Sequence, residues 1–201
     1  MNALGQLRTL LHPPPNQPFH DLLTIISQDD HVQKTGLYPW VTSSSLYRLI
    51  DAMKQGVDFA HEIWGFRTTP YDLVFACDAT DSAGAISFNR MFVGESLPAR
   101  EPVLYVTNVF VVRAMKHAHC GDLVRFGHMP DYVPDLPAFH VMALQTIEEC
   151  LHAKQYRFGM RPLQGSTLEH RDDPMEQEVS DLMPDIIREF RFKEAMDLRY
   201  P

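Results

Sequence analysis

Residues 102–122, PVLYVTNVFVVRAMKHAHCGD, constrain the fold of this chain more than any other stretch. From residue 103 to residue 112 the side chains are β-branched, aromatic or aliphatic, and only Thr107 and Asn108 interrupt them. Such a run predicts a strand that is covered on both faces and lies in the middle of a sheet. A polar cluster around Gly121 follows within a few residues, and the end of a central strand is where α/β proteins commonly place ligands. We therefore expect an α/β fold with a binding site at residues 116–122.

Length and charge limit the classes of partner. A chain of 201 residues is long enough for one domain with a sizeable core, and 45% of its residues are hydrophobic. With 26 acidic against 18 basic residues, the formal net charge is −8. This excess of negative charge argues against nucleic acid and anionic membranes as partners. No apolar run reaches the length of a membrane span.

The three cysteines, Cys77, Cys120 and Cys150, are odd in number and lack CxxC spacing. A disulfide framework or a zinc ribbon therefore has no support, and we expect a cytoplasmic protein.

Periodicity predicts the remaining elements. One of Ser43, Ser44 and Ser45 can cap a helix that runs toward Gly65, with Gly56 as a possible interruption. Residues 72–77 and 84–93 read as two strands joined by a polar turn, so we expect an antiparallel hairpin.

Beyond the central strand, residues 139–144 (FHVMAL) predict a fourth short strand. Residues 146–156 have helical spacing, and Gly159 can end that helix. Residues 178–198 predict a C-terminal helical segment divided at Pro184.

This order of elements resembles the GNAT acyltransferase superfamily over roughly residues 43–166. The resemblance implies a mixed, mostly antiparallel central sheet flanked by helices. It divides the chain into a helical N-terminal arm (1–18), an acyltransferase domain (19–170) and a C-terminal helical extension (171–201). In the family, the turn after the central strand carries a basic residue and two small residues, and Lys116 and Gly121 match that pattern while His119 occupies the first small position.

The resemblance also implies a function, which is transfer of an acyl group from acetyl-CoA or another acyl-CoA to an amine. The acceptor amine would belong to a small molecule or a protein. Tyr156 would protonate the departing thiolate, Asn108 would orient the acceptor, and Glu148 or its neighbour Glu149 would act as base. The implied cofactor-binding residues are Val111, Val112, Lys116, His119, Cys120, Gly121 and Asp122.

Two alternatives remain open, and a third is not expected. GDLVRFG followed by PAFHVMAL is similar to NlpC-type cysteine peptidases, with Cys77 as nucleophile and His140 as base. A catalytically silent GNAT-like subunit would use its terminal extensions to dock on neighbours in an oligomer or a larger assembly. A metal site at the histidines and cysteine of residues 117–128 is the third, but their spacing matches no zinc motif and we expect no metal there.

Overall fold

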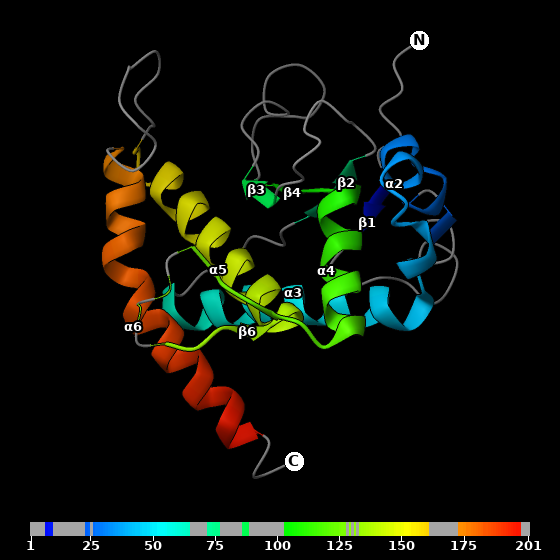
Figure 1. The fold of residues 1–201 in the computed structure, drawn as a ribbon. Coiled ribbons are helices and arrows are strands. Elements are labelled where there is room, and N and C mark those ends of the chain that lie inside the picture. The colour runs from blue at the N-terminus through cyan, green and yellow to red at the C-terminus, as the bar shows by residue number, and fades with distance from the viewer. Residues whose placement is uncertain are drawn as a thin grey trace.

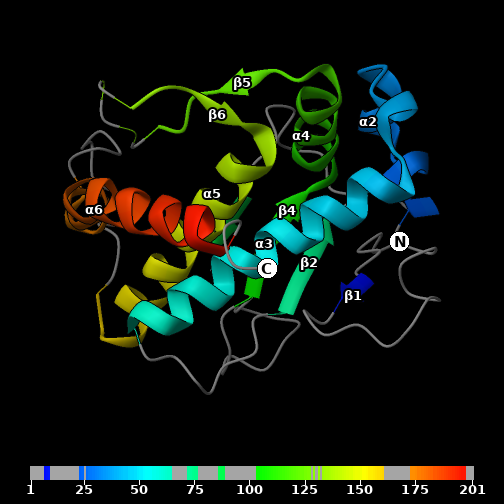
Figure 2. The same cartoon turned by 90° about the horizontal axis from the view of Figure 1, so that it is seen from below.

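The computed structural model describes residues 7–9, 23–24, 26–64, 72–76, 86–88, 103–127, 129, 131, 133–160 and 173–197. Its helices are α2 (Asp30–Lys34), the 3-10 helix η1 (Tyr38–Trp40), α3 (Ser43–Trp64), α4 (Asn108–Cys120), α5 (Ala138–Arg157) and α6 (Pro174–Asp197). Its strands are β1 (Leu7–Thr9), β2 (Asp72–Ala76), β3 (Ile86–Phe88), β4 (Val103–Thr107), β5 (Leu123–Val124) and β6 (Leu136–Pro137). Figure 1 shows α5 and α6 side by side, and Figure 2 shows α3 lying across α4 and α5.

The described part of the chain is mostly helical, so the expected GNAT-like sheet flanked by helices is wrong. Strands of three to five residues form a small sheet in the order β1-β2-β4-β3, in which β2 and β4 are parallel and the outer pairs are antiparallel. The expected hairpin is also wrong, because β4 lies between β2 and β3. Residues 7–9 of the N-terminal arm, which was expected to be helical, form strand β1 because they pair with β2 at the edge of the sheet. Strands β5 and β6 form a separate antiparallel pair.

The long central strand is half the length that the sequence predicted. β4 ends at Thr107, and α4 begins at Asn108 and includes Val111 and Val112, which are fully buried in the core. Asparagine and threonine are favoured at helix N-termini, so the two polar residues in the run mark a change from strand to helix. Tertiary burial outweighs the β preference of the valines that follow.

The predicted strand at residues 139–144 is wrong, because these residues form the first turns of α5. Helix α5 is buried on several sides, by α3, α4 and α6. Its first turns, residues 138–144, are apolar apart from His140, and so short an apolar stretch cannot be told from a buried strand by periodicity. The predicted end is confirmed, since Gly159 follows α5 with a φ of +89°.

Helix α3 matches the prediction closely. Its N-terminus is capped by the Thr42 side chain, which accepts a hydrogen bond from the Ser45 amide at 3.3 Å, rather than by one of the three serines. Gly56 does not interrupt the helix. It lies where α3 crosses α5, and a Cβ atom at this position would stand 2.5 Å from the Ala143 carbonyl oxygen.

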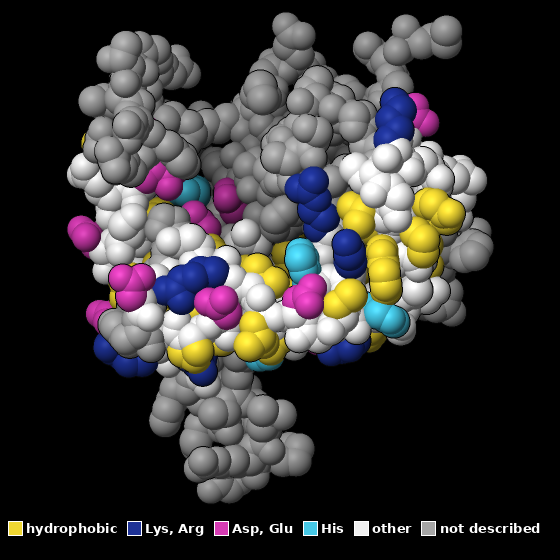
Figure 3. Space-filling model, viewed as in Figure 1, with side chains coloured by type: hydrophobic (Ala, Val, Ile, Leu, Met, Phe, Trp, Pro, Cys, Tyr) yellow, Lys and Arg dark blue, Asp and Glu magenta, His cyan; other side chains and the backbone are white. Residues whose placement is uncertain are grey.

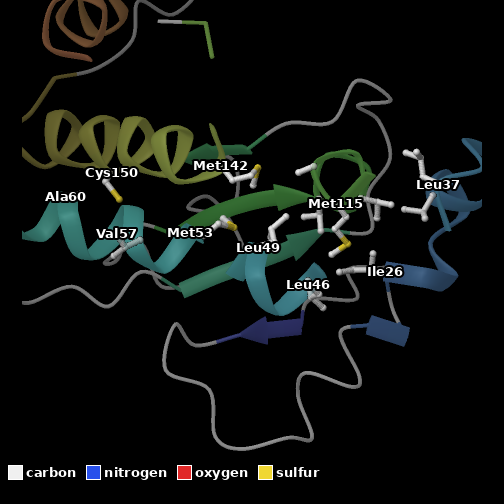
Figure 4. Close-up of a cluster of buried hydrophobic side chains, with 14 of the residues drawn as sticks. Ile26, Leu37, Leu46, Leu49, Met53, Val57, Ala60, Met115, Met142 and Cys150 are labelled. Atoms are coloured by element: carbon white, nitrogen blue, oxygen red, sulfur yellow. The ribbon is translucent and has the colours of Figure 1, made fainter. Parts of the chain in front are cut away.

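Two clusters of buried apolar side chains form the core. The first joins α2, α3, α4 and one face of α5, and Figure 4 shows Met53 and Val57 of α3 with Met115 and Cys150 in it. The second joins α5, α6 and the β5–β6 pair, and the rings of Phe59 and Phe190 meet edge to face with centroids 5.1 Å apart. Helix α6 is continuous through Pro184. None of the helices in the described ranges is long and apolar enough to cross a membrane.

Candidate metal centre between α5 and α6

Three polar side chains form a stripe along α5. Glu148, His152 and Gln155 are spaced i, i+4 and i+7, so they project from one face of the helix. His152 and Gln155 are 7% and 2% exposed, which is unusual for polar residues unless they have partners. The partners of this stripe lie on the first turn of α6.

That first turn is built by a local signal in the sequence. Asp173 caps α6, because its Oδ1 atom accepts a hydrogen bond from the Met175 amide at 2.8 Å. Pro174 occupies the first helical position, where its missing amide costs nothing, and Glu176 falls at the third position. The helix therefore begins at residue 174, four residues before the predicted start, and its first turn presents an acidic side chain to α5.

The two helices bring an imidazole and two carboxylates together. One donor atom from each of Glu148, His152 and Glu176 lies within 4.8 Å of the other two. His152 Nε2 is 3.5 Å from Glu176 Oε1, and these two side chains are 9% and 12% exposed. In Figure 3, acidic side chains and a histidine gather where α5 and α6 meet. Among the residues that the structure describes, these three form the one group of histidine, cysteine or acidic side chains close enough together to share one ion.

The donor set and its spacing fit a divalent metal. Zinc binds histidine nitrogen and carboxylate oxygen at about 2.0–2.2 Å, which places tetrahedral ligands about 3.4 Å apart. The separation of 3.5 Å between His152 Nε2 and Glu176 Oε1 agrees with that value, and all three donor atoms lie within 4.8 Å of one another. The Glu176 side chain is 12% exposed, so a bound cation would interact with its carboxylate more strongly than at an open surface.

The predicted cofactor-binding residues lie elsewhere, on α4 and the turn that ends it. Val111 and Val112 belong to α4 and are buried in the core, rather than lying on the edge of a strand. Lys116 is exposed. The His119 ring packs against Trp40 with centroids 4.8 Å apart. The strand that was expected to pair with the cofactor is therefore a helix at these positions.

The turn lies at the C-terminus of a helix, α4, and not at the N-terminus of one. Gly121 has a φ of +72°, the Asp122 amide bonds to the His117 carbonyl at 2.9 Å, and the Gly121 amide approaches the Ala118 carbonyl at 3.4 Å. This is the Schellman arrangement of a helix C-terminus. Cys120 ends the helix and is exposed. A helix C-terminus carries partial negative charge, which is unfavourable for the pyrophosphate expected there.

The expected catalytic residues do not share one location. Asn108 is the first residue of α4, Tyr156 is in the last turn of α5, and the structure does not describe their side chains. Glu148 does lie in a candidate site, as a neighbour of His152 and Glu176. Cys77 and His128 fall outside the described residues, and His140 is in α5 rather than at the start of a strand. Acyl transfer and cysteine peptidase activity both stay predictions.

The spacing of Glu148 and His152 in the sequence was a signal for the metal centre that the sequence analysis did not use. In zinc peptidases, the helical motif His-Glu-x-x-His places two ligands one turn apart with a glutamate general base between them. Residues 148–152, EECLH, have that spacing with a glutamate at the first ligand position. Nothing in the local sequence indicates that Glu176, 24 residues later, would join them.

Comparison of the chain with protein-family models, with curated proteins and with solved structures finds no match.

Proposed function

We propose that this protein binds one divalent transition-metal ion through Glu148, His152 and Glu176 and uses it for hydrolysis. The observation that carries the proposal is the convergence of these three donors, from two helices, within 4.8 Å of one another. One imidazole and two carboxylates suit Zn²⁺, and the two oxygen ligands also suit Mn²⁺.

Three protein ligands favour a catalytic over a structural role. Structural zinc sites are usually closed by four side chains, whereas catalytic sites have three and leave a position for water or substrate. A divalent ion held by this set would supply Lewis acidity and make water a stronger nucleophile.

Glu149 is the candidate general base. It directly follows the ligand Glu148 in the sequence, as the general base follows the first ligand in the zinc peptidase motif, and it is 8% exposed. In this scheme its carboxylate takes a proton from the attacking water and then donates that proton to the leaving group. An amide bond is the substrate class that we would test first.

The first experiment measures metal binding. Titration of metal-free protein with Zn²⁺ and Mn²⁺, followed by calorimetry, should give a stoichiometry of one and a higher melting temperature for the loaded protein. His152→Gln and Glu176→Gln should each weaken binding by about 100-fold or more, because each removes one of three ligands. Asp181→Asn, a matched change at an exposed position of α6, should bind normally. Equal binding by all four proteins, or none by the wild type, would reject the metal site.

The second experiment separates binding from catalysis. Glu149→Gln keeps all three ligands and should bind zinc normally but lose about 100-fold or more of any hydrolysis of a fluorogenic peptide library. Full activity of Glu149→Gln would exclude this residue as the base. Tight zinc binding without hydrolysis of any substrate would leave a metal-binding protein and remove the catalytic half of the proposal.

A further inference from the structure

Gln155 connects the two halves of the candidate metal centre. Its Oε1 atom is 2.9 Å from His152 Nδ1, and its Nε2 atom is 2.9 Å from the Met175 carbonyl oxygen and 3.0 Å from Glu178 Oε2. One amide therefore contacts the imidazole on α5 and two acceptors on the first turns of α6. At 2% exposure it has no access to bulk water for these interactions.

Its neighbours fix the orientation of the Gln155 amide. The Met175 carbonyl and the Glu178 carboxylate are both acceptors, so the group that faces them must be the NH₂, which has two hydrogens to donate. Turning the amide over would direct its oxygen at two other oxygens. The carbonyl oxygen of Gln155 must then face His152.

In the neutral ring, this orientation determines which nitrogen of His152 carries the proton. A carbonyl oxygen cannot donate, so Nδ1 of His152 must donate to it. The neutral ring then has its lone pair on Nε2, the atom that faces Glu176 at 3.5 Å. A metal ion or a second ring proton between Nε2 and the Glu176 carboxylate would remove the repulsion between the lone pair and the carboxylate oxygens.

From these contacts we infer that Gln155 is the positioning residue of the metal centre. It selects the His152 tautomer whose Nε2 atom can bind a metal, and it holds the first turn of α6 so that Glu176 faces that atom. The inference rests on the proposed metal site and adds how the site is kept ready for an ion. Hydrogen bonds of this kind to a ligating histidine commonly set its orientation and basicity.

The Gln155→Met variant removes all three hydrogen bonds while nearly preserving side-chain volume. We expect it to bind Zn²⁺ about 10- to 100-fold more weakly than the wild type. Gln155→Glu separates the two roles, because a carboxylate still accepts from Nδ1 but repels the Met175 carbonyl and Glu178. It should keep the tautomer and lose protection from amide exchange in the first turn of α6. Gln177→Met, at an exposed position of α6, is the matched control and should behave as wild type.

The protonation of the two ring nitrogens of His152 is measured directly by ¹⁵N NMR in metal-free protein at alkaline pH. A proton on Nδ1 in the wild type, and its redistribution in Gln155→Met, support the inference. A proton on Nε2 in the wild type overturns it, and this readout needs neither bound metal nor a folded variant.

The zinc affinities of the wild type and Gln155→Met provide a second, independent test. If the wild type binds no zinc, the proposed function fails while the NMR result still decides the role of Gln155 in orienting the ring. If the wild type binds zinc and folded Gln155→Met binds it equally well, the metal site stands and the positioning role is rejected.

Discussion

Two clusters of histidine and acidic side chains lie on neighbouring helices and differ in almost every physical respect. At the end of α4, His117 and Asp122 form a pair with Nδ1 and Oδ2 2.9 Å apart, and their side chains are 44% and 47% exposed. Between α5 and α6, the side chains of His152 and Glu176 are 9% and 12% exposed. The first cluster comes from one turn of chain, and the second needs two helices that meet.

Several histidine, cysteine and acidic residues close together in the sequence do not by themselves identify a functional site. Water competes for every interaction at the α4 end, so an exposed ion pair there contributes little. Between α5 and α6 the side chains of His152 and Glu176 are largely shielded from water, so electrostatic interactions there are screened less. The following predictions test whether burial separates the two regions as sharply as the structure indicates.

The largest effect is expected for apolar contacts that hold α6 in place. Phe190→Ala removes a ring that is 4% exposed and packs on Phe59, and should reduce the free energy of unfolding by about 3–5 kcal/mol. Leu123→Ala, just beyond the α4 end and 61% exposed, should change it by less than about 0.5 kcal/mol. Urea denaturation measures both. Similar losses for the two variants would mean that α6 is not part of the cooperative core.

The two described cysteines should differ strongly in reactivity. Cys120 is exposed at the α4 end, whereas Cys150 is buried against α3, and burial together with the nearby Glu149 carboxylate raises the pKa of the Cys150 thiol. A maleimide should label Cys150 at least about 100-fold more slowly than Cys120 in native protein. Peptide mapping of a time course measures the ratio, and unfolding in urea should abolish it. Equal rates in native protein would contradict the buried position of Cys150.

Two glycines should respond differently to alanine. Gly56→Ala places a methyl group against the Ala143 backbone oxygen, which cannot move away without separating α3 from α5, and we expect a loss of about 1–3 kcal/mol. Gly121→Ala meets no atom within 4 Å but must adopt a φ of +72°, and we expect a loss of about 1 kcal/mol.

Thermal and urea unfolding measure the loss of stability caused by the steric clash at Gly56 and by the positive φ at Gly121. Gly127→Ala, where a Cβ atom meets nothing within 4 Å, is the control. A smaller loss at Gly56 than at Gly121 would show that the α3–α5 crossing can relax.

The smallest effect is expected for the exposed pair at the α4 end. His117→Ala removes the side-chain contact with Asp122 but leaves the backbone bond between these residues, so stability should fall by less than about 1 kcal/mol. The change should shrink further in high salt. A loss above about 2 kcal/mol would show that the pair is far more important than its exposure indicates.

Parts of the fold and of the site were within reach of the sequence. The apolar spacing from Leu46 to Val57 predicted α3, and Gly159 predicted the end of α5, because both signals are local. Glu148 was selected as a functional residue, although as a base in a different reaction. The valines after Asn108 and the run at residues 139–144 were misread, because their β-branched or continuous apolar character reflects deep burial in helices.

The sequence by itself determined where helices cap and end, since a cap, a proline or a glycine acts on the few residues beside it. It also determined the spacing of Glu148, His152 and Gln155 along one helix face. Only the tertiary structure decided that this face meets the first turn of α6, because that contact depends on how the apolar sides of α5 and α6 pack around Leu151, Val179 and Met183. A binding site made by two distant segments arises from that packing, and no local pattern specifies it.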